Sequence, residues 1–416
     1  MFRFRSQLVF AAGLITVILL AWTPVDRSAG RLPQASKSSA EPTLTGIDVY
    51  ESMDSQAFAG KRVGLITNQT GIDSQGVRTT EVFAHSPSVK LVAIFTPEHG
   101  ISGRVDAPIA DSTDPDTGVP IYSLYGVTRR PADAMLGGID VLIFDIQDAG
   151  VRFYTYVTTM AYCMEAAAKH HIPFVVLDRP DPLGGEVIEG PMLDSGRESF
   201  TGYFPMPVRY GMTLGELAGM FNAENKIGAD LHVFPMKNWR RSETYDQTGL
   251  RWIPPSPNLP TLDAEFLYPG IEILQAGGLS VGRGTETPFE IIGAPWVRAG
   301  ELAQELNRRK IPGVSIAPVQ FTPREGLYRG EPCRGVTLRI TDRSRIASMR
   351  MGLEIADTMN RTYPDKFQLE KTIELLGSQS TIDRLKRFDG PGEIVSSWSA
   401  DLARFRAMRD KYLLYH

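Results

Sequence analysis

A glutamate and a histidine stand side by side directly after a strongly apolar segment. The run FTPEHG contains Glu98 and His99, and it follows residues 89–94, which read VKLVAI. This pattern is typical of a buried strand in a parallel sheet. Ligands of open α/β sheets bind beyond the carboxyl ends of the strands, where this pair is expected. A carboxyl group and an imidazole titrate on either side of pH 5, so the pair provides acid–base capacity. The alternative is an ordinary loop whose two side chains face solvent.

Three further polar clusters follow predicted strands in the same way. They begin after residues 62–67, 140–146 and 174–177, and parallel strands end at one edge of a sheet, so all four clusters should converge. Arg152 could grip a carboxylate through two hydrogen bonds, and Tyr154 offers the flat face and hydroxyl that suit a sugar ring. The candidate residues in these clusters are Asn68, Gln147, Asp148, Arg152, Tyr154, Asp178 and Arg179.

Each cluster also has a purely structural interpretation. Asp148 and Arg152 could form an ion pair where a helix begins. Asp178 and Arg179 could belong to a strand exit followed by turns. These alternatives remain open at the level of sequence.

The second half of the chain contributes two more candidate segments. The proline-rich run PPSPNLPT could hold Asn258 over a ligand, or simply connect two elements. In the run SVGRGTETPFE, glycines flank Arg283 and permit close approach of the backbone, and Glu286 follows three residues later. The alternative for Arg283 and Glu286 is a salt bridge at the surface.

The spacing of apolar runs predicts an α/β protein. Short strands that are apolar throughout alternate with helical segments from residue 46 to about residue 212, which predicts βαβ units in a parallel sheet covered on both faces. After residue 212 the pattern becomes α+β, with a helix over 214–225 capped by Thr213 and Glu216. We therefore predict a first domain at 46–212 and a smaller α+β domain at 213–416. The other predicted elements are helices at 79–84, 156–169, 301–309, 347–363 and 398–413, and strands at 231–234, 314–321 and 335–341.

Length and composition narrow the class of protein. The chain has 416 residues, which is longer than a single hydrophobic core usually supports. Its contents of 42% hydrophobic and 22% charged residues are typical of a globular protein. The net charge of −4 and the lack of a basic stripe argue against nucleic acid as a partner. The sequence has no phosphate-binding glycine motif and no zinc-type ligand spacing, so neither a nucleotide cofactor nor a bound metal is expected. Cys163 and Cys333 could be free thiols or one disulfide.

The amino-terminal segment predicts export. A short cationic lead precedes 15 apolar residues at 8–22, which is short for a membrane span and fits a secretory signal. We therefore interpret residues 1–30 as a signal peptide or an uncleaved anchor and residues 31–45 as a linker. The expected location is secreted or periplasmic, with membrane contact only through such an anchor. The sequence indicates no particular oligomeric state.

The order of the motifs resembles the exo-β-N-acetylmuramidase family, a group of secreted bacterial glycoside hydrolases that act on peptidoglycan. The motifs are LITNQTG, FTPEHG, TGVPIYSLYG, DIQDAGVRFYTYVTTM, DRPDPLGG, PVRYGMTLGELA, IPPSPNLPT and SVGRGTETPFE. The resemblance implies a Rossmann-like domain, a smaller second domain, and release of N-acetylmuramic acid from non-reducing ends of glycan fragments without a cofactor. It places the main catalytic glutamate on Glu98. This chain departs from the family after EHG, where Arg104 is displaced and Asp106-Ala107 precedes Pro108 rather than glycine.

Such hydrolysis commonly needs a carboxylic acid to protonate the leaving oxygen and a second group to act as nucleophile or to activate water. We expect Glu98 to be the acid, with His99 orienting it, and Asp148, then Glu286, then Asp178 to be candidates for the second group. The lactyl carboxylate of the sugar should meet Arg152, Arg179 or Arg283. The alternative function is a peptidoglycan-binding protein without catalysis, because polar clusters at a sheet edge serve binding equally well.

Overall fold

The computed structural model describes residues 41–53 and 56–416. The predicted signal segment, residues 1–30, and most of the predicted linker lie outside the described residues. The last part of that linker, however, belongs to the fold. The amide of Thr43 donates to the carbonyl of Thr248 at 3.1 Å, and Leu44 forms an antiparallel bridge with Lys237.

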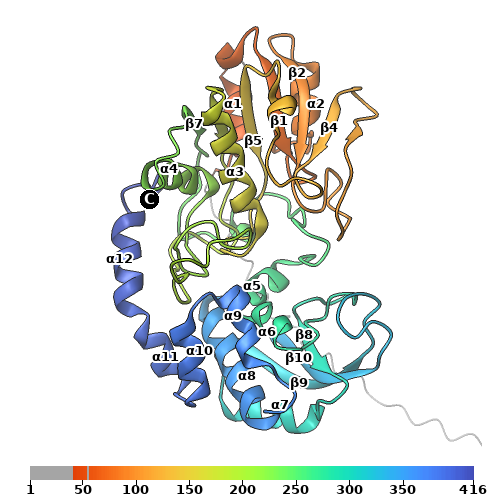
Figure 1. Ribbon diagram of the computed structural model, residues 1–416, viewed down its shortest axis with the longest axis vertical. Coiled ribbons are helices and arrows are strands. Elements are labelled where there is room, and N and C mark those ends of the chain that lie inside the picture. The colour runs from red at the N-terminus through yellow and green to blue at the C-terminus, as the bar shows by residue number, and fades with distance from the viewer. Residues whose placement is uncertain (1–40, 54–55) are drawn as a thin grey trace, which may run out of the picture. The chain divides into compact units, whose positions relative to one another are not determined.

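The first half of the chain forms a seven-stranded sheet with helices on its faces (Figure 1). Its strand order is β3-β4-β2-β1-β5-β6-β7, and all neighbouring pairs are parallel except β3 with β4. The strands are β1 (Arg62–Thr67), β2 (Lys90–Thr96), β3 (Ser112–Thr113), β4 (Pro120–Ser123), β5 (Val141–Asp145), β6 (Phe174–Leu177) and β7 (Leu231–Phe234). The predicted parallel α/β architecture is therefore confirmed.

Both faces of this sheet are covered, which explains why its central strands are apolar throughout. Side chains that alternate along each strand enter two separate buried clusters. On one face they meet α1 (Gly46–Ser52) and α2 (Thr79–His85). On the other they meet α3 (Thr155–Lys169) and α4 (Leu214–Glu224). The predicted cap of α4 is present, because Thr213 Oγ1 accepts from the amide of Glu216.

The second half contains a three-stranded antiparallel sheet with helices. Its strand order is β8-β10-β9, and β10 pairs with both neighbours. The strands are β8 (Ile291–Ala294), β9 (Val314–Phe321) and β10 (Cys333–Ile340). The helices are α5 (Leu262–Ile271), α6 (Ile273–Ala276), α7 (Ala299–Arg308), α8 (Ser348–Thr362), α9 (Ile373–Leu376), α10 (Gln379–Lys386), α11 (Pro391–Ser397) and α12 (Ser399–Arg409). Short 3₁₀ helices occur at Gln56–Phe58, Asp133–Leu136, Tyr245–Gln247, Arg343–Arg345 and Leu369–Thr372.

The predicted domain boundary at residue 212 is too early. β7 pairs in parallel with β6, from Phe174 opposite Leu231 to Leu177 opposite Phe234, so α4 and β7 belong to the large sheet. The change of pattern near residue 210 reflects the long irregular connection between β6 and α4, which separates two elements of one domain. Sequence periodicity also missed α5, whose start lies within the proline-rich stretch, and the short strands β3, β4 and β8.

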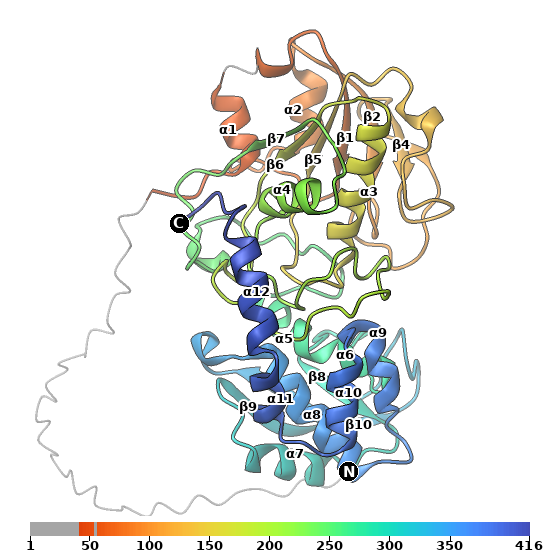
Figure 2. The ribbon, with the colours of Figure 1, turned by 60° about the vertical axis from the view of Figure 1, so that its left-hand side comes forward.

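The carboxyl terminus returns to the large sheet domain. The hydroxyl of Tyr415 donates to Asp178 Oδ2 at 2.5 Å, and the amide of Leu414 donates to Glu216 Oε1 at 2.8 Å. Figures 1 and 2 accordingly show the C-terminus beside α4. These bonds close the chain onto the domain in which the sheet begins.

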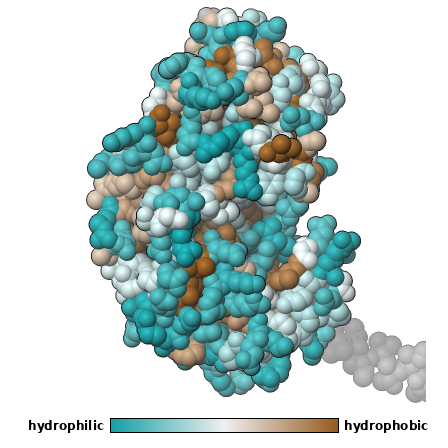
Figure 3. Space-filling view, in the orientation of Figure 1, coloured by the Kyte–Doolittle hydropathy of each residue, from teal (hydrophilic) through white to brown (hydrophobic). Residues whose placement is uncertain are grey.

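The surface is predominantly polar. On the face in Figure 3, hydrophilic residues predominate and apolar residues form small separate patches. Across residues 41–53 and 56–416, no helix is both long and apolar enough to cross a membrane.

Candidate active site

A tight turn after β2 presents Glu98 and His99. The backbone of His99 has φ 70°, and that of Gly100 has φ 67°. This left-handed conformation is uncommon for a histidine and is found where a side chain must be aimed, so the turn fits a functional position. Thr155 Oγ1 donates to Glu98 Oε2 at 2.6 Å, and the backbone carbonyl of Glu98 lies 3.1 Å from the hydroxyl of Tyr156. These contacts fix the carboxylate against the start of α3.

Glu98 and His99 line a pocket that distant segments build together. The start of α3, the proline-rich loop before α5, α5 itself and the glycine-rich loop before β8 all contribute side chains. The lining residues are Glu98, His99, Asp106, Phe153, Tyr154, Thr155, Ser256, Asn258, Leu259, Tyr268, Arg283 and Phe289. The loop before α5 is held in place because Gln69 Nε2 donates to the carbonyl of Pro254 at 2.8 Å.

Asp106 is the second carboxylate of this pocket. Asn258 Nδ2 donates to its Oδ2 at 3.1 Å, and Arg283 Nη1 lies 3.8 Å from the same oxygen. His99 Nδ1 lies 3.7 Å from Asp106 Oδ1 and 2.9 Å from the carbonyl of Val105. One ligand atom from each of Glu98, His99 and Asp106 lies within 4.8 Å of the others. These three could in principle hold a cation, although the guanidinium beside Asp106 opposes it.

Arg283 joins the acidic and aromatic walls of the pocket. Its Nη2 donates to Glu272 Oε1 at 2.8 Å, and its guanidinium carbon lies 5.3 Å from the centre of the Phe289 ring. Burial raises the pKa of Glu272, and the neighbouring guanidinium opposes that shift. Burial, followed by the negative charge of Glu272, raises the pKa of the Tyr268 hydroxyl well above its usual value. Aromatic faces next to charged groups suit a sugar, which is apolar across its ring and polar at its rim.

Five of the residues proposed from sequence meet in this pocket: Glu98, His99, Tyr154, Asn258 and Arg283. Glu286 lies on the same glycine-rich loop as Arg283, but its side chain is exposed and is not among the lining residues.

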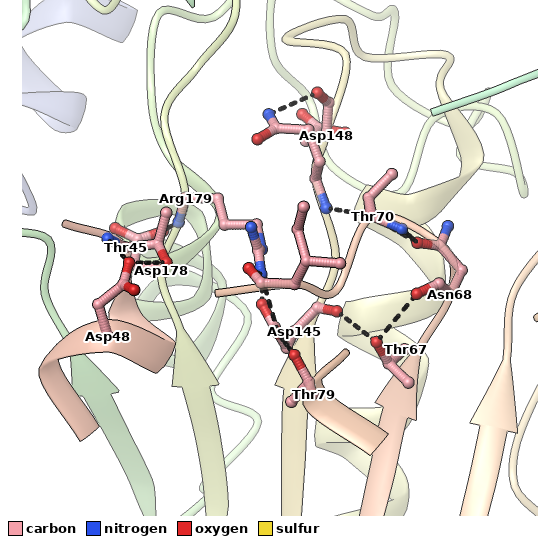
Figure 4. A network of polar contacts seen from close by, with 12 residues as sticks. Thr45, Asp48, Thr67, Asn68, Thr70, Thr79, Asp145, Asp148, Asp178 and Arg179 are labelled. Atoms are coloured by element: carbon pink, nitrogen blue, oxygen red, sulfur yellow. Dashed lines mark hydrogen bonds and ion pairs between the residues drawn. The ribbon is translucent and has the colours of Figure 1, made fainter. Parts of the chain in front are cut away.

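Asp178, Arg179 and Asn68 lie instead in a polar network at the carboxyl ends of β1, β5 and β6 (Figure 4). Gln147 joins this network because its amide donates to Thr70 Oγ1 at 2.9 Å. Arg179 binds both carboxylate oxygens of Asp145, at 2.6 and 2.9 Å. Asp178 accepts from Thr213, Gly215 and the penultimate residue Tyr415.

Gln147 and Asn68 complete this network. Gln147 Nε2 donates to the carbonyls of Asp148 and Pro180, and Asn68 Oδ1 accepts from the amide and hydroxyl of Thr70. The network ties loops to one another and leaves little of these side chains exposed.

Arg152 and Asp148 are also committed to the protein interior. Arg152 is 0% exposed, and its guanidinium donates to the carbonyls of Pro191, Met206, Leu375 and Leu376 at 2.7–3.1 Å. Asp148 accepts from the hydroxyl of Tyr210 and the amide of Gly150, and burial raises its pKa to about 6. Neither side chain is among those lining the pocket.

Sequence reasoning did not select several residues of the site. Asp106 was noted only as part of a departure from the family pattern, although its position eight residues after Glu98 was a usable signal. Thr155 lies inside the recognised DIQDAGVRFYTY segment. Tyr268 and Glu272 had no such signal, because α5 was not predicted; only the tertiary fold brings Tyr268 to the pocket and Glu272 to Arg283.

Comparison with known proteins gives a consistent assignment over most of the chain. Residues 63–263 match the model of the N-terminal domain of exo-β-N-acetylmuramidase NamZ, and residues 266–415 match that of its C-terminal domain. The peptidoglycan β-N-acetylmuramidase NamZ of Bacillus subtilis (strain 168) is 42% identical over 395 residues, which are 93% of this chain and 95% of that protein.

Crystal structures of two DUF1343 family proteins from Bacteroides fragilis NCTC 9343 are also similar. The first has a TM-score of 0.83 and 39% identity, and the second has 0.75 and 31%. Each comparison covers 90% of this chain and 99% of the other.

Proposed function

Because this chain belongs to the exo-β-N-acetylmuramidase family, we propose that its pocket hydrolyses the β-glycosidic bond of a terminal N-acetylmuramic acid in peptidoglycan fragments. The observation that carries the proposal is the meeting of Glu98 and Asp106, two carboxyl groups from the segment after β2, with Tyr154, Tyr268 and Arg283 from other segments. A pair of carboxylates flanking the scissile bond is what most glycoside hydrolases use.

Glu98 is the proton donor in this proposal. Thr155 binds one of its oxygens, which orients the carboxyl group toward the pocket. A positioned acid that protonates the leaving oxygen contributes typically about 10²–10⁴-fold to the rate. His99 anchors the turn through its Nδ1 contact with Val105 and thereby holds Glu98 in place.

Asp106 supplies the second carboxylate, as nucleophile or as the group that orients a reacting part of the substrate. Asn258 and Arg283 hold it in place. Its closest approach to Glu98 lies within 4.8 Å. Retaining enzymes place their two carboxyl groups about 5–5.5 Å apart, whereas inverting enzymes need about 6.5–9.5 Å to admit a water. If Asp106 acts as the nucleophile, the anomeric configuration is retained.

The test is product analysis with defined disaccharides. The wild-type protein should release N-acetylmuramic acid from MurNAc–GlcNAc and leave GlcNAc–MurNAc intact, as mass spectrometry would show. Glu98→Gln and Asp106→Asn should each reduce turnover at least about 10²-fold with unchanged thermal stability. Glu286→Gln is the matched control, since that carboxylate is exposed on a neighbouring loop, and it should retain activity.

Two results would contradict the proposal. Binding of the disaccharide without any released sugar would favour the non-catalytic function. Near-wild-type activity of Glu98→Gln would remove Glu98 from the mechanism. Proton NMR of the first-formed sugar decides the anomeric outcome, and an inverted product would exclude Asp106 as nucleophile.

We propose in addition that residues 1–30 direct the protein out of the cytoplasm, to the cell envelope in which its peptidoglycan substrate lies. The cationic lead and the apolar run at 8–22 support this proposal. Cell fractionation with amino-terminal sequencing tests it. Intact protein confined to the cytoplasm would contradict it.

A further inference from the structure

The loop after β4, residues 124–130, begins beside the turn that carries Glu98. The amide of Leu124 donates to the carbonyl of Thr96 at 2.8 Å, two residues before Glu98. The motif TGVPIYSLYG ends within this loop. Burial, then hydrogen bonding to Glu98 and its negative charge, raise the pKa of Tyr125 to about 12, and the charge of Arg129 opposes this shift.

Arg129 is held against Phe200 by stacking. Its guanidinium carbon lies 4.2 Å from the centre of the Phe200 ring, within the range of a cation–π contact. The Phe200 ring in turn stacks on Tyr125, with ring centroids 6.2 Å apart and an angle of 27° between the ring planes. Phe200 thus connects Arg129 to Tyr125, the residue on which hydrogen bonding to Glu98 acts.

The neighbouring Arg130 provides a contrast. Its guanidinium lies over Tyr162 and forms an ion pair with Glu165. The described residues show no hydrogen bond or ion pair to the guanidinium of Arg129, which is exposed. Of these two adjacent arginines, Arg130 has its charge compensated and Arg129 presents its charge to solvent.

The charge balance of the pocket leaves a need for such a cation. Glu98 and Asp106 contribute two carboxyl groups to the lining, and Arg283 is shared between Asp106 and Glu272, which lies behind it. An anionic substrate entering this site meets more negative than positive groups, and like charges in a cleft reduce affinity. Arg152 and Arg179 cannot compensate, because backbone carbonyls and Asp145 already occupy them.

We propose that Arg129 recognises the lactyl carboxylate of the substrate and so distinguishes N-acetylmuramic acid from uncharged amino sugars. This inference rests on the proposed function. The lactyl group and the anomeric carbon belong to the same sugar ring, so a cation fixed through Tyr125 and Phe200 to the vicinity of Glu98 can bind one while Glu98 acts on the other. A guanidinium matches the geometry of a carboxylate with two parallel hydrogen bonds.

The experiment compares two substrates: MurNAc–GlcNAc and the same disaccharide with its lactyl carboxylate converted to a methyl ester. For Arg129→Gln, KM for the acid should rise about 10- to 100-fold, the range expected for a lost charge-assisted hydrogen-bonded contact. The ester should be hydrolysed as by the wild type, and kcat should change little for either substrate. Arg129→Lys should recover part of the affinity for the acid, and Arg130→Gln is the matched control.

The outcomes separate the two proposals. If the wild type hydrolyses neither substrate, the proposed function fails. If the wild type is active and Arg129→Gln still prefers the acid by the wild-type ratio, the inference about Arg129 is wrong. Equal losses on acid and ester would also overturn it, because they would indicate a structural effect. Calorimetric titration of MurNAc–GlcNAc into the Glu98→Gln protein, and into the double variant that also carries Arg129→Gln, compares the two binding affinities without turnover.

Discussion

Replacement of Arg152 by lysine should weaken folding and leave the chemistry intact. The guanidinium makes four hydrogen bonds in two pairs: Nη1 binds the carbonyls of Pro191 and Met206, and Nη2 binds those of Leu375 and Leu376. A single ammonium cannot reach both pairs, so at least two buried carbonyls lose their donors.

The magnitude follows from those bonds. Hydrogen bonds to charged groups contribute about 1.5–3 kcal/mol each, so Arg152→Lys should cost roughly 3–6 kcal/mol. Burial lowers the pKa of Arg152 to about 9, so the wild-type side chain is still charged at neutral pH. With an unfolding entropy of about 2.1 cal/mol/K per residue, roughly 0.8 kcal/mol/K for this fold, Tm should fall by roughly 4–8 °C.

Differential scanning calorimetry at pH 7 measures this change, and kcat/KM on MurNAc–GlcNAc below the transition measures activity. Arg308→Lys, on the exposed face of α7 with 64% of its side chain accessible, is the matched control and should leave Tm unchanged. An unchanged Tm for Arg152→Lys together with a large loss of affinity for the sugar would refute the structural role and restore the substrate contact considered from sequence.

Two further predictions concern buried groups. The pKa of Asp148 is raised to about 6 by burial, so the folded state binds its proton more tightly than the unfolded state and this group's contribution to stability falls as pH rises from about 4 through 6. Asp148→Asn should therefore flatten the decline of Tm over that range, and parallel Tm–pH curves for the two proteins would contradict the assignment. Cys163 and Cys333 are both free and buried, so intact mass should show two thiols, reductant should not change Tm, and both should react with a thiol reagent only after unfolding; a mass two hydrogens lighter would contradict this.

The sequence by itself determined the parallel sheet and the central residues of the site. Strands buried on both faces must be apolar throughout, so β1, β2, β5 and β6 were identifiable within two residues of their observed bounds. The placement of polar residues after such strands located Glu98 and His99, because the carboxyl edge of a parallel sheet is fixed by topology. The long motifs identified the family.

Only the tertiary structure decided which polar residues face the pocket and which tie loops together. Arg152 and Arg283 look equivalent in sequence, yet one is enclosed by four backbone carbonyls and the other lies between Asp106 and Glu272. The difference depends on partners up to 224 positions away along the chain, which no local pattern encodes. The same holds for Asp178, whose partner Tyr415 is the penultimate residue. A side chain's chemistry is set by its residue type, but its availability is set by which distant segment packs against it in the folded structure.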